Sequence, residues 1–196
     1  MSGNTTVSKE GELSGKVALI TGAASGIGLA ITRRFLKEQA LVAMVDINLE
    51  KLTTIAAELQ ETYPTAQILP VQCDITKEDA VEKAVKTIAD HFGRLNIAVN
   101  NAGVSVSVPS EQCTLEQWNW VMSINCTGSF LVSREAIKVF MRQSDGGAIV
   151  YINSDDALKP SRHFLAYNSS KAAVLQMART IANEFGKYKI RANSVL

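Results

Sequence analysis

Short apolar runs alternate with longer amphipathic stretches along most of the chain. Runs such as 17–20 (VALI) and 41–45 (LVAMV) have the near-continuous apolar character of strands that are buried on both faces. Between the runs, apolar residues recur every three or four positions, as they do on one face of a helix. The pattern predicts strands at 17–20, 41–45, 67–73, 95–99, 148–152 and 189–196, and helices at 27–36, 49–62, 77–92, 115–141 and 164–185.

This order of elements predicts an α/β fold with a doubly wound parallel sheet and helices on both faces. Consecutive strands that are joined through a helix form right-handed crossovers, and such units assemble into parallel sheets. Pro70 favours an edge position for the run 67–73, because proline cannot donate a ladder hydrogen bond. Since no linker-like segment divides the chain, we expect one domain over residues 15–196, preceded by a loose polar tail over residues 1–14.

Composition narrows the classes of function. The chain has 196 residues, is 46% hydrophobic and carries a formal net charge of +1. A chain of this length buries roughly 70% of its unfolded surface and needs no disulfide or metal to hold a core. The near-neutral charge argues against a nucleic-acid partner, and the longest apolar run, 40–45, is too short to span a membrane. Three cysteines without a CxxC pair fit a reduced, cytoplasmic protein with no metal site.

The first predicted strand runs directly into TGAASGIG (21–28), where a helix is predicted to begin. Glycines here permit a tight turn and a close approach of the backbone, and the N–H groups of a helix N-terminus attract a pyrophosphate. The spacing is GxxxGxG, which differs from the GxGxxG of the general dinucleotide fingerprint. The segment therefore indicates either a phosphate-binding loop or a turn with a tight helix–strand contact.

Asp46 strengthens the dinucleotide interpretation, because it ends the second predicted strand. It stands 18 residues beyond Gly28, where an acidic side chain accepts hydrogen bonds from an adenosine ribose and repels a 2′-phosphate. Neither Ser25 nor Ile47 supplies a compensating cation, so NAD is favoured over NADP. The alternative is that Asp46 only caps the helix that starts near Leu49.

Tyr167 and Lys171 lie four residues apart in the last predicted helix, and therefore on one helical face. A free tyrosine has a pKa of about 10, which is poorly matched to proton transfer at neutral pH. A neighbouring ammonium favours the phenolate and lowers that pKa. The pair suits a general acid/base with its electrostatic partner, although a surface pair on an amphipathic helix has the same spacing.

Two further polar residues point to the same edge of the sheet. Ser154 follows the strand predicted at 148–152, and open parallel sheets bind ligands at the carboxyl ends of their strands. Asn125 interrupts the predicted helix 115–141 with a poor helix former. It marks either a local kink or a functional amide.

Taken together, these segments resemble those of the short-chain dehydrogenases/reductases of the classical type. The TGxxxGIG element of that family matches 21–28, its NNAG element matches 100–103, and its acidic adenine-contacting position matches Asp74. Its catalytic Asn-Ser-Tyr-Lys set matches, in order and spacing, Asn125, Ser154, Tyr167 and Lys171. The resemblance covers residues 16–196 and implies a Rossmann-like fold.

The resemblance implies a role for each matched residue. Tyr167 would exchange the proton of the substrate oxygen, Ser154 would polarise that oxygen, and Lys171 would tune the tyrosine and bind the nicotinamide ribose. Asn125 would hold a water in a proton relay. The expected cofactor-binding residues are Gly22, Ser25, Gly26, Ile27, Gly28, Asp46, Asp74, Ile75, Asn101, Ala102, Gly103, Tyr167 and Lys171. The family also implies a homodimer or homotetramer formed through the stretches 115–141 and 164–185.

The sequence departs from the family pattern at two places. Asp155 and Asp156 follow the serine where small residues are usual, which indicates either a capped, solvated loop or selection of a polar, hydroxyl-rich or cationic substrate. In the family, a segment like 191–195 is followed by a Pro-Gly turn, a substrate loop, a helix and a seventh strand. We expect six strands and an incomplete catalytic domain here, because that continuation is absent from the sequence.

These observations predict an oxidoreductase that transfers a hydride between NAD(H) and a secondary alcohol or ketone. The alternative is a dinucleotide-binding regulatory or structural module without turnover. The four matched polar residues favour the enzyme, whereas the absent substrate wall favours the module. The identity of the substrate depends on the loops 104–110 and 155–164 and on the absent C-terminal segment, because loops vary with the substrate while the scaffold does not.

Overall fold

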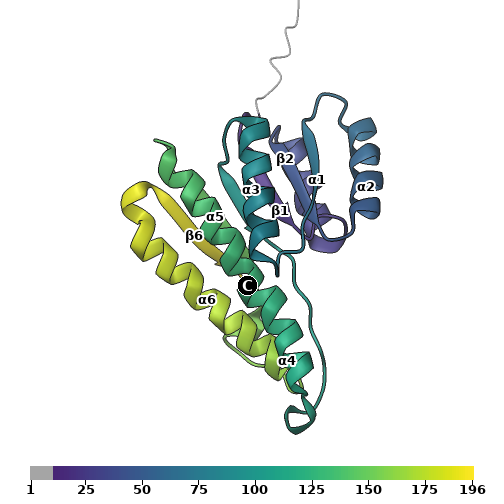
Figure 1. Ribbon diagram of the computed structural model, residues 1–196, viewed down its shortest axis with the longest axis vertical. Helices are drawn as coiled ribbons and strands as arrows, with labels where there is room; N and C mark the ends of the chain where they lie inside the picture. Colours follow the sequence, from purple (N-terminus) through teal and green to yellow (C-terminus); the bar gives the residue numbers. More distant parts are fainter. Residues whose placement is uncertain (1–10) are drawn as a thin grey trace, which may run out of the picture.

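A six-stranded parallel sheet forms the centre of the computed structural model, which describes residues 11–196 (Figure 1). The strands are β1 (Val17–Thr21), β2 (Leu41–Asp46), β3 (Ile68–Gln72), β4 (Ile97–Asn100), β5 (Gly147–Ile152) and β6 (Ile190–Val195). Their order is β3-β2-β1-β4-β5-β6, and every neighbouring pair is parallel. The direction of winding reverses between β1 and β4, so the loops that leave these two strands diverge and open a crevice between them.

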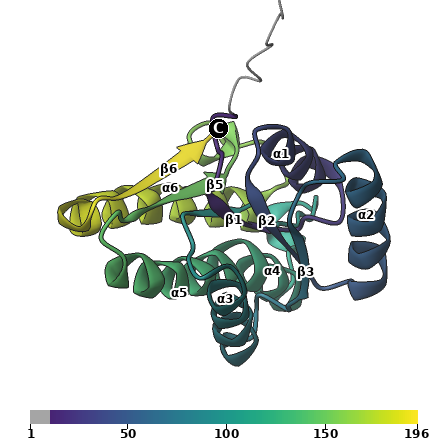
Figure 2. The same ribbon diagram turned by 90° about the horizontal axis from the view of Figure 1, so that it is seen from above.

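Helices cover both faces of the sheet (Figure 2). The longer ones are α1 (Gly26–Lys37), α2 (Leu49–Thr62), α3 (Glu78–Phe92), α4 (Leu115–Met122), α5 (Ser129–Arg142) and α6 (Leu165–Phe185). One apolar cluster joins the sheet to α3, α5 and α6, and a second joins the opposite face to α1 and α2. Short turns of 3₁₀-helix complete the chain at η1 (Ser110–Gln112), η3 (Asp155–Ala157) and η4 (Gly186–Tyr188).

The predicted α/β fold with a doubly wound parallel sheet is confirmed. The proline-containing strand β3 lies at the edge of the sheet, and Gly93 ends α3 in the left-handed conformation with φ of 75°. Of the predicted tail, residues 1–10 lie outside the described part of the chain. Its last residues are tied to the end of α1, since Leu13 N donates to Glu38 O and Gly11 N donates to the Gln39 side chain.

The predicted helical stretch 115–141 is helical throughout, and the local interruption considered at Asn125 is a π-helical segment, η2 (Ser123–Gly128), between α4 and α5. A π-turn accommodates an extra residue in the helix, which re-aims the side chains within it. Here it carries Asn125, whose side chain bonds Val104 in the loop after β4. The contact is distant in sequence, so helical periodicity alone does not reveal the interruption.

No helix within residues 11–196 is long and apolar enough to cross a lipid bilayer.

Gly28 sets the close contact between α1 and β1 and provides a test of the fold. A Cβ at this position would overlap the Gly22 carbonyl oxygen and the Asn101 side chain. We expect Gly28→Ala to lower the free energy of unfolding by about 1–3 kcal/mol, because the backbone must shift. Thermal and urea unfolding measure this change.

The matched control is Gly186→Ala. Gly186 has helical φ of −56°, and within residues 11–196, apart from its chain neighbours and the adjacent helical backbone, no atom lies within 4 Å of its added Cβ. This variant should be as stable as the wild type or slightly more stable, because alanine has the higher helix propensity. Equal destabilisation by the two substitutions would contradict the packing role of Gly28.

Candidate functional site

The glycine loop joins the end of β1 to the start of α1 in the crevice. Gly22 and Gly26 have φ of 65° and 54°, which are left-handed conformations that glycine adopts without steric cost. Ser25 precedes α1 in an extended conformation, and among the described residues no side chain caps the helix N-terminus. The first turn of α1 also has no acidic side chain. Its N–H groups and partial positive charge therefore suit an anion.

The carboxylate of Asp46 forms a hydrogen bond with the backbone of the glycine loop. One oxygen accepts the Ala24 N–H at 3.1 Å, and the other accepts the Asn48 N–H at 3.1 Å. The alternative role for Asp46, as the cap of α2, belongs to Asn48, whose side chain accepts from Lys51 N at 2.9 Å. Asp46 thus stands where β2 leaves the sheet, beside the loop that it braces.

Thr21 is a site residue that residue-by-residue reasoning missed. Its hydroxyl accepts the N–H groups of Asn101 and Ala102, each at 3.0 Å, and donates to Val99 O at 3.3 Å. The Asn101 side chain donates in turn to Thr21 O at 2.9 Å. These bonds hold the loop after β4 against the end of β1. The position of Thr21 as the first residue of the TGxxxGIG element is the sequence feature that could have indicated this role.

These loops enclose one cavity of about 660 Å³, a volume typical of small-molecule sites. Ten predicted cofactor residues line it: Gly22, Ser25, Gly26, Ile27, Asp46, Asp74, Ile75, Asn101, Ala102 and Gly103. The other three predicted cofactor residues, Gly28, Tyr167 and Lys171, are not in the lining, and Gly28 lies instead at the helix–strand contact. The lining also includes Val104, Trp120, Ser123 and Ile124, which were not among the predicted cofactor residues.

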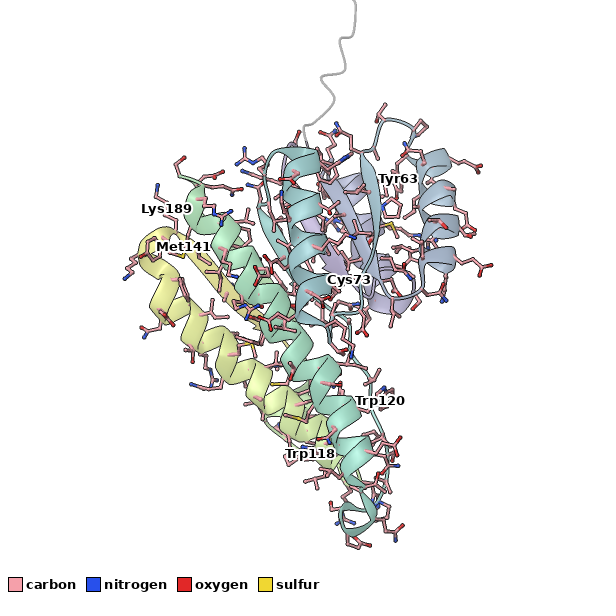
Figure 3. All side chains as sticks on the ribbon, in the orientation of Figure 1. Tyr63, Cys73, Trp118, Trp120, Met141 and Lys189 are labelled. Carbon is pink, nitrogen blue, oxygen red and sulfur yellow. The ribbon has the colours of Figure 1, made fainter. Side chains whose placement is uncertain are left out.

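Two side chains of this lining are labelled in Figure 3. Trp120 projects from α4 on the side opposite to Trp118, as the helical spacing predicts, and is 47% exposed. Cys73 is buried at the end of β3, and burial raises the pKa of its thiol to about 11. Cys73 therefore stays protonated at neutral pH and acts there as a small apolar residue.

Tyr167 and Lys171 lie one turn apart on α6, with the Lys171 ammonium 5.5 Å from the centre of the tyrosine ring. The ammonium donates to Ile152 O, at the end of β5, over 2.7 Å. Lys171 is 7% exposed, and its burial lowers the pKa of the ammonium to about 8. A buried cation with one backbone partner is costly to hold and therefore a candidate functional group.

Asn125 connects α6 to the cofactor side of the crevice. Its Oδ1 accepts Val104 N at 2.8 Å, while its Nδ2 donates to Val104 O at 2.9 Å and to Ser170 Oγ at 3.0 Å. Asn125 is 2% exposed, so these bonds satisfy a buried amide. Since Val104 also lines the cavity, Asn125 links the dinucleotide half of the crevice to the helix of Tyr167.

Ser154 lies two residues beyond the end of β5 and caps η3. Its Oγ accepts Asp156 N at 3.2 Å, and the carboxylates of Asp155 and Asp156 lie 3.4 and 3.5 Å from it. The cap of this turn is therefore the serine, not an aspartate. Asp156 instead accepts Ser161 N at 2.9 Å, which closes the loop that follows.

The loop after β4 and the loop after β5 are in contact with each other. Val108 N donates to His163 O at 2.7 Å, and Val108 forms an isolated parallel bridge with Phe164. His163 has φ of 67°, a left-handed conformation that costs a non-glycine residue about 1 kcal/mol or more. This bond joins the two segments in which substrate determinants are expected.

A doubly wound sheet with a glycine loop at its switch point and a tyrosine–lysine helix beside it defines a dinucleotide-binding α/β protein. A family model described as short chain dehydrogenase matches residues 16–196, and the chain belongs to that family. The predicted family resemblance is confirmed.

Curated relatives agree with this membership. The chain is 42% identical over 192 residues to the uncharacterized oxidoreductase YuxG of Bacillus subtilis, an alignment that covers 98% of this chain and 28% of that protein. It is 37% identical to D-threitol dehydrogenase of Mycolicibacterium smegmatis, covering 93% of this chain and 69% of that protein. It is 34% identical to NAD-dependent glycerol dehydrogenase of Listeria innocua, covering 95% of this chain and 71% of that protein.

Solved structures show the same fold. A short chain dehydrogenase from Mycobacterium smegmatis superposes with a TM-score of 0.91 at 31% identity, covering 94% of this chain and 77% of that one. NAD⁺-bound xylitol dehydrogenase superposes with a TM-score of 0.89 at 32% identity, covering 93% of this chain and 70% of that one.

The buried ammonium of Lys171 makes stability depend on pH. The ordinary lysine pKa of 10.5 applies to the unfolded chain, whereas burial lowers the pKa to about 8 in the folded protein. Between these values the unfolded chain binds more protons, so the free energy of unfolding should rise with pH. The rise attributable to Lys171 is at most about 3 kcal/mol.

Urea unfolding at pH 7.5 and pH 10 measures this effect, as the difference between wild type and Lys171→Met. The variant should lack the Lys171 part of the rise. Lys83→Met, at an exposed position on α3, should keep the wild-type dependence. Identical curves for wild type and Lys171→Met would show that the ammonium is not held in a destabilising environment.

Proposed function

We propose that this protein is an NAD(H)-dependent dehydrogenase that interconverts a secondary alcohol and a ketone, with Tyr167 as the general acid/base. The observation that carries the proposal is the placement of the buried Lys171 ammonium beside the Tyr167 ring, at the carboxyl edge of a sheet whose crevice fits a dinucleotide. Family membership supports the reaction class.

The residues present fit a nicotinamide dinucleotide. The open N-terminus of α1 would hold the pyrophosphate, Asp46 the adenosine ribose, and Asp74 with Ile75 the adenine. A Cβ on Gly22 would approach Asn101 Nδ2 to 2.9 Å, so this turn accepts only glycine without adjustment. When bound, the nicotinamide supplies the hydride chemistry.

The negative charge of Asp46 supports NAD as the cofactor. Its carboxylate stands at the end of β2 between Ala24 and Asn48, where a 2′-phosphate would be repelled. The neighbouring Ile47 is apolar and lines the same cavity. A relative with 34% identity is named an NAD-dependent dehydrogenase, which supports the same choice.

Each polar residue at the carboxyl edge has a distinct task in this mechanism. In oxidation, Tyr167 accepts the hydroxyl proton of the substrate, and in reduction it donates that proton to the carbonyl oxygen. Ser154 donates a hydrogen bond to the same oxygen. Lys171 stabilises the phenolate of Tyr167 and binds the nicotinamide ribose. Asn125 holds the π-turn and α6 in place, and it supports the water of the proton relay.

The substrate class that we propose is a small, hydroxyl-rich alcohol. Relatives are named for D-threitol, glucose and glycerol, and a solved neighbour is named for xylitol. The loop after β4 exposes Ser105 and Ser107, and the loop after β5 exposes Asp155. Such groups can form hydrogen bonds with several hydroxyls.

Assembly into a homodimer or homotetramer stays a prediction. Exposed apolar side chains do lie on the implicated helices, with Phe130 and Met141 on α5 and Leu165 on α6. The exposed fractions of these side chains are 45%, 44% and 42%, respectively. These residues are compatible with an interface between copies.

Tyr167→Phe tests the proposed acid/base. The variant lacks the phenolic hydroxyl, so kcat for polyol oxidation should fall by about 10²- to 10⁴-fold. NAD binding, measured by calorimetry, should remain within about twofold, because the cavity lining is intact. Tyr188→Phe, an exposed tyrosine beyond α6, serves as the matched control. An unchanged kcat would remove Tyr167 from this role.

The same assay separates the enzyme from the non-catalytic module. A panel of polyols and their ketones, followed by NADH absorbance, is run with NAD binding measured in parallel. Binding without turnover across the panel would favour the module. Turnover that depends on Tyr167 would support the enzyme.

Asp46→Asn tests the cofactor preference. For the wild type, the ratio of kcat/KM with NAD to that with NADP should exceed one. Asparagine keeps an oxygen for the Ala24 N–H but removes the charge, so the ratio should fall by about tenfold or more. A wild-type ratio below one, or a ratio insensitive to Asp46→Asn, would overturn the assignment to NAD.

A further inference from the structure

The backbone of Ser161 forms hydrogen bonds on both sides of its Cα. Its N–H donates to Asp156 Oδ1 at 2.9 Å, and its carbonyl oxygen accepts from Asn168 Nδ2 at 2.8 Å. Ser161 itself is exposed and lies in the middle of the loop after β5. The two bonds therefore connect η3 to α6 across this loop. We refer to Asp156, Ser161 and Asn168 as the loop brace.

Both ends of the loop brace adjoin the residues proposed to grip the substrate oxygen. At one end, the backbone N–H of Asp156 donates to Ser154 Oγ at 3.2 Å. At the other end, Asn168 directly follows Tyr167 on α6. A series of short contacts thus runs from the serine hydroxyl to the helix that carries the tyrosine, independent of the sheet.

The environment of Asn168 shows that this contact is held at a cost. Asn168 Oδ1 is buried and, within residues 11–196, has no hydrogen-bond partner. A buried, unpaired acceptor costs about 1–3 kcal/mol. Asparagine is also a poor helix former, so the bond from its Nδ2 to Ser161 is the interaction that offsets these costs.

The rest of the loop has few other constraints near Ser161. Residues 158–163 are all exposed. Its far end is tied through His163 O to Val108 N. Within the described chain, the segment next to η3 is held only by the backbone N–H groups of Leu158 and Lys159, which both donate to Asp155 O at 2.8 Å. Among residues 160–163, the loop brace is therefore the interaction that connects the loop to both η3 and α6.

We infer that Asp156 and Asn168 are positioning residues, which fix the Ser154 hydroxyl relative to Tyr167 through the backbone of Ser161. This inference rests on the proposed function, because the distance between two groups on one substrate oxygen matters only for turnover. A misplacement of about 1 Å in such a pair can lower kcat by about 10²-fold. NAD binding, on the other side of the crevice, should be unaffected.

A double-mutant cycle tests the loop brace. Asp156→Ala and Asn168→Ala should each lower kcat by about 10- to 100-fold, with NAD affinity within about twofold of the wild type. Because both residues act through the backbone of Ser161, the kcat of the double variant should fall little further than that of the worse single variant. Asp156→Asn keeps an oxygen acceptor for Ser161 N–H and should retain most of the wild-type kcat.

The controls separate positioning from other effects. Asn183→Ala makes the same substitution at an exposed site on α6 and should leave kcat within about threefold of the wild type. Hydrogen exchange adds a readout that needs no turnover, since the Ser161 amide should be protected in the wild type and exchange faster in Asp156→Ala. If Asn168→Ala fails to fold, the positioning role is tested by the kcat values of Asp156→Ala and Asp156→Asn alone.

The outcomes are distinguishable. An inactive wild type that binds NAD would overturn the proposed function and the positioning role together. An active wild type with unchanged kcat in Asp156→Ala, or with multiplicative losses in the double variant, would overturn the loop brace only. A rise in KM for the polyol that is equal in Asp156→Asn and Asp156→Ala would show that the charge of Asp156 binds substrate, and would also overturn the positioning role.

Discussion

The carboxyl edge of the parallel sheet imposes the constraint on which the rest of the site depends. All six strands end at this edge, so each loop that leaves it must find partners for polar groups that the sheet no longer satisfies. The Thr21 hydroxyl does this for the loop after β4, and Asp46 does it for the glycine loop. Ile152 O accepts from the Lys171 ammonium. The bonds that complete the fold are the same bonds that arrange the crevice.

Two features of the site, the π-turn and the buried Lys171, lower the stability of the fold but place a functional side chain. The π-turn at η2 interrupts a helix that would otherwise be regular, and in exchange Asn125 reaches Val104 and Ser170 together. Lys171 remains buried with a lowered pKa although an apolar side chain would pack there at less cost. Departures from local preference of this kind are concentrated at functional sites. Here Lys171 lies on α6, the helix that carries Tyr167, and the π-turn is bonded to that helix through Asn125 and Ser170.

The sequence predicts most of the sheet because its signals are local. Runs such as 41–45 are apolar on both faces, and Pro70 can be accommodated only at an edge. The cofactor residues are predictable for a similar reason, since ten of them come from short segments at strand ends. The π-turn is not predictable in this way, because it depends on a bond between Asn125 and Val104 across 21 residues. The Asp156–Ser161 contact depends likewise on the folded course of a loop.

The bond between Val108 and His163 joins the loop after β4 to the loop after β5. One loop is also fastened to η2 at Val104, and the other continues directly into α6. A change of length or shape in either loop is therefore transmitted to the other, and through it to the tyrosine helix. If only one of these loops were replaced by the loop of a relative, its contact with the other loop would no longer be the one found in either protein. In the proposed enzyme, the unit whose exchange should alter substrate preference is the joined pair, 104–110 together with 155–164.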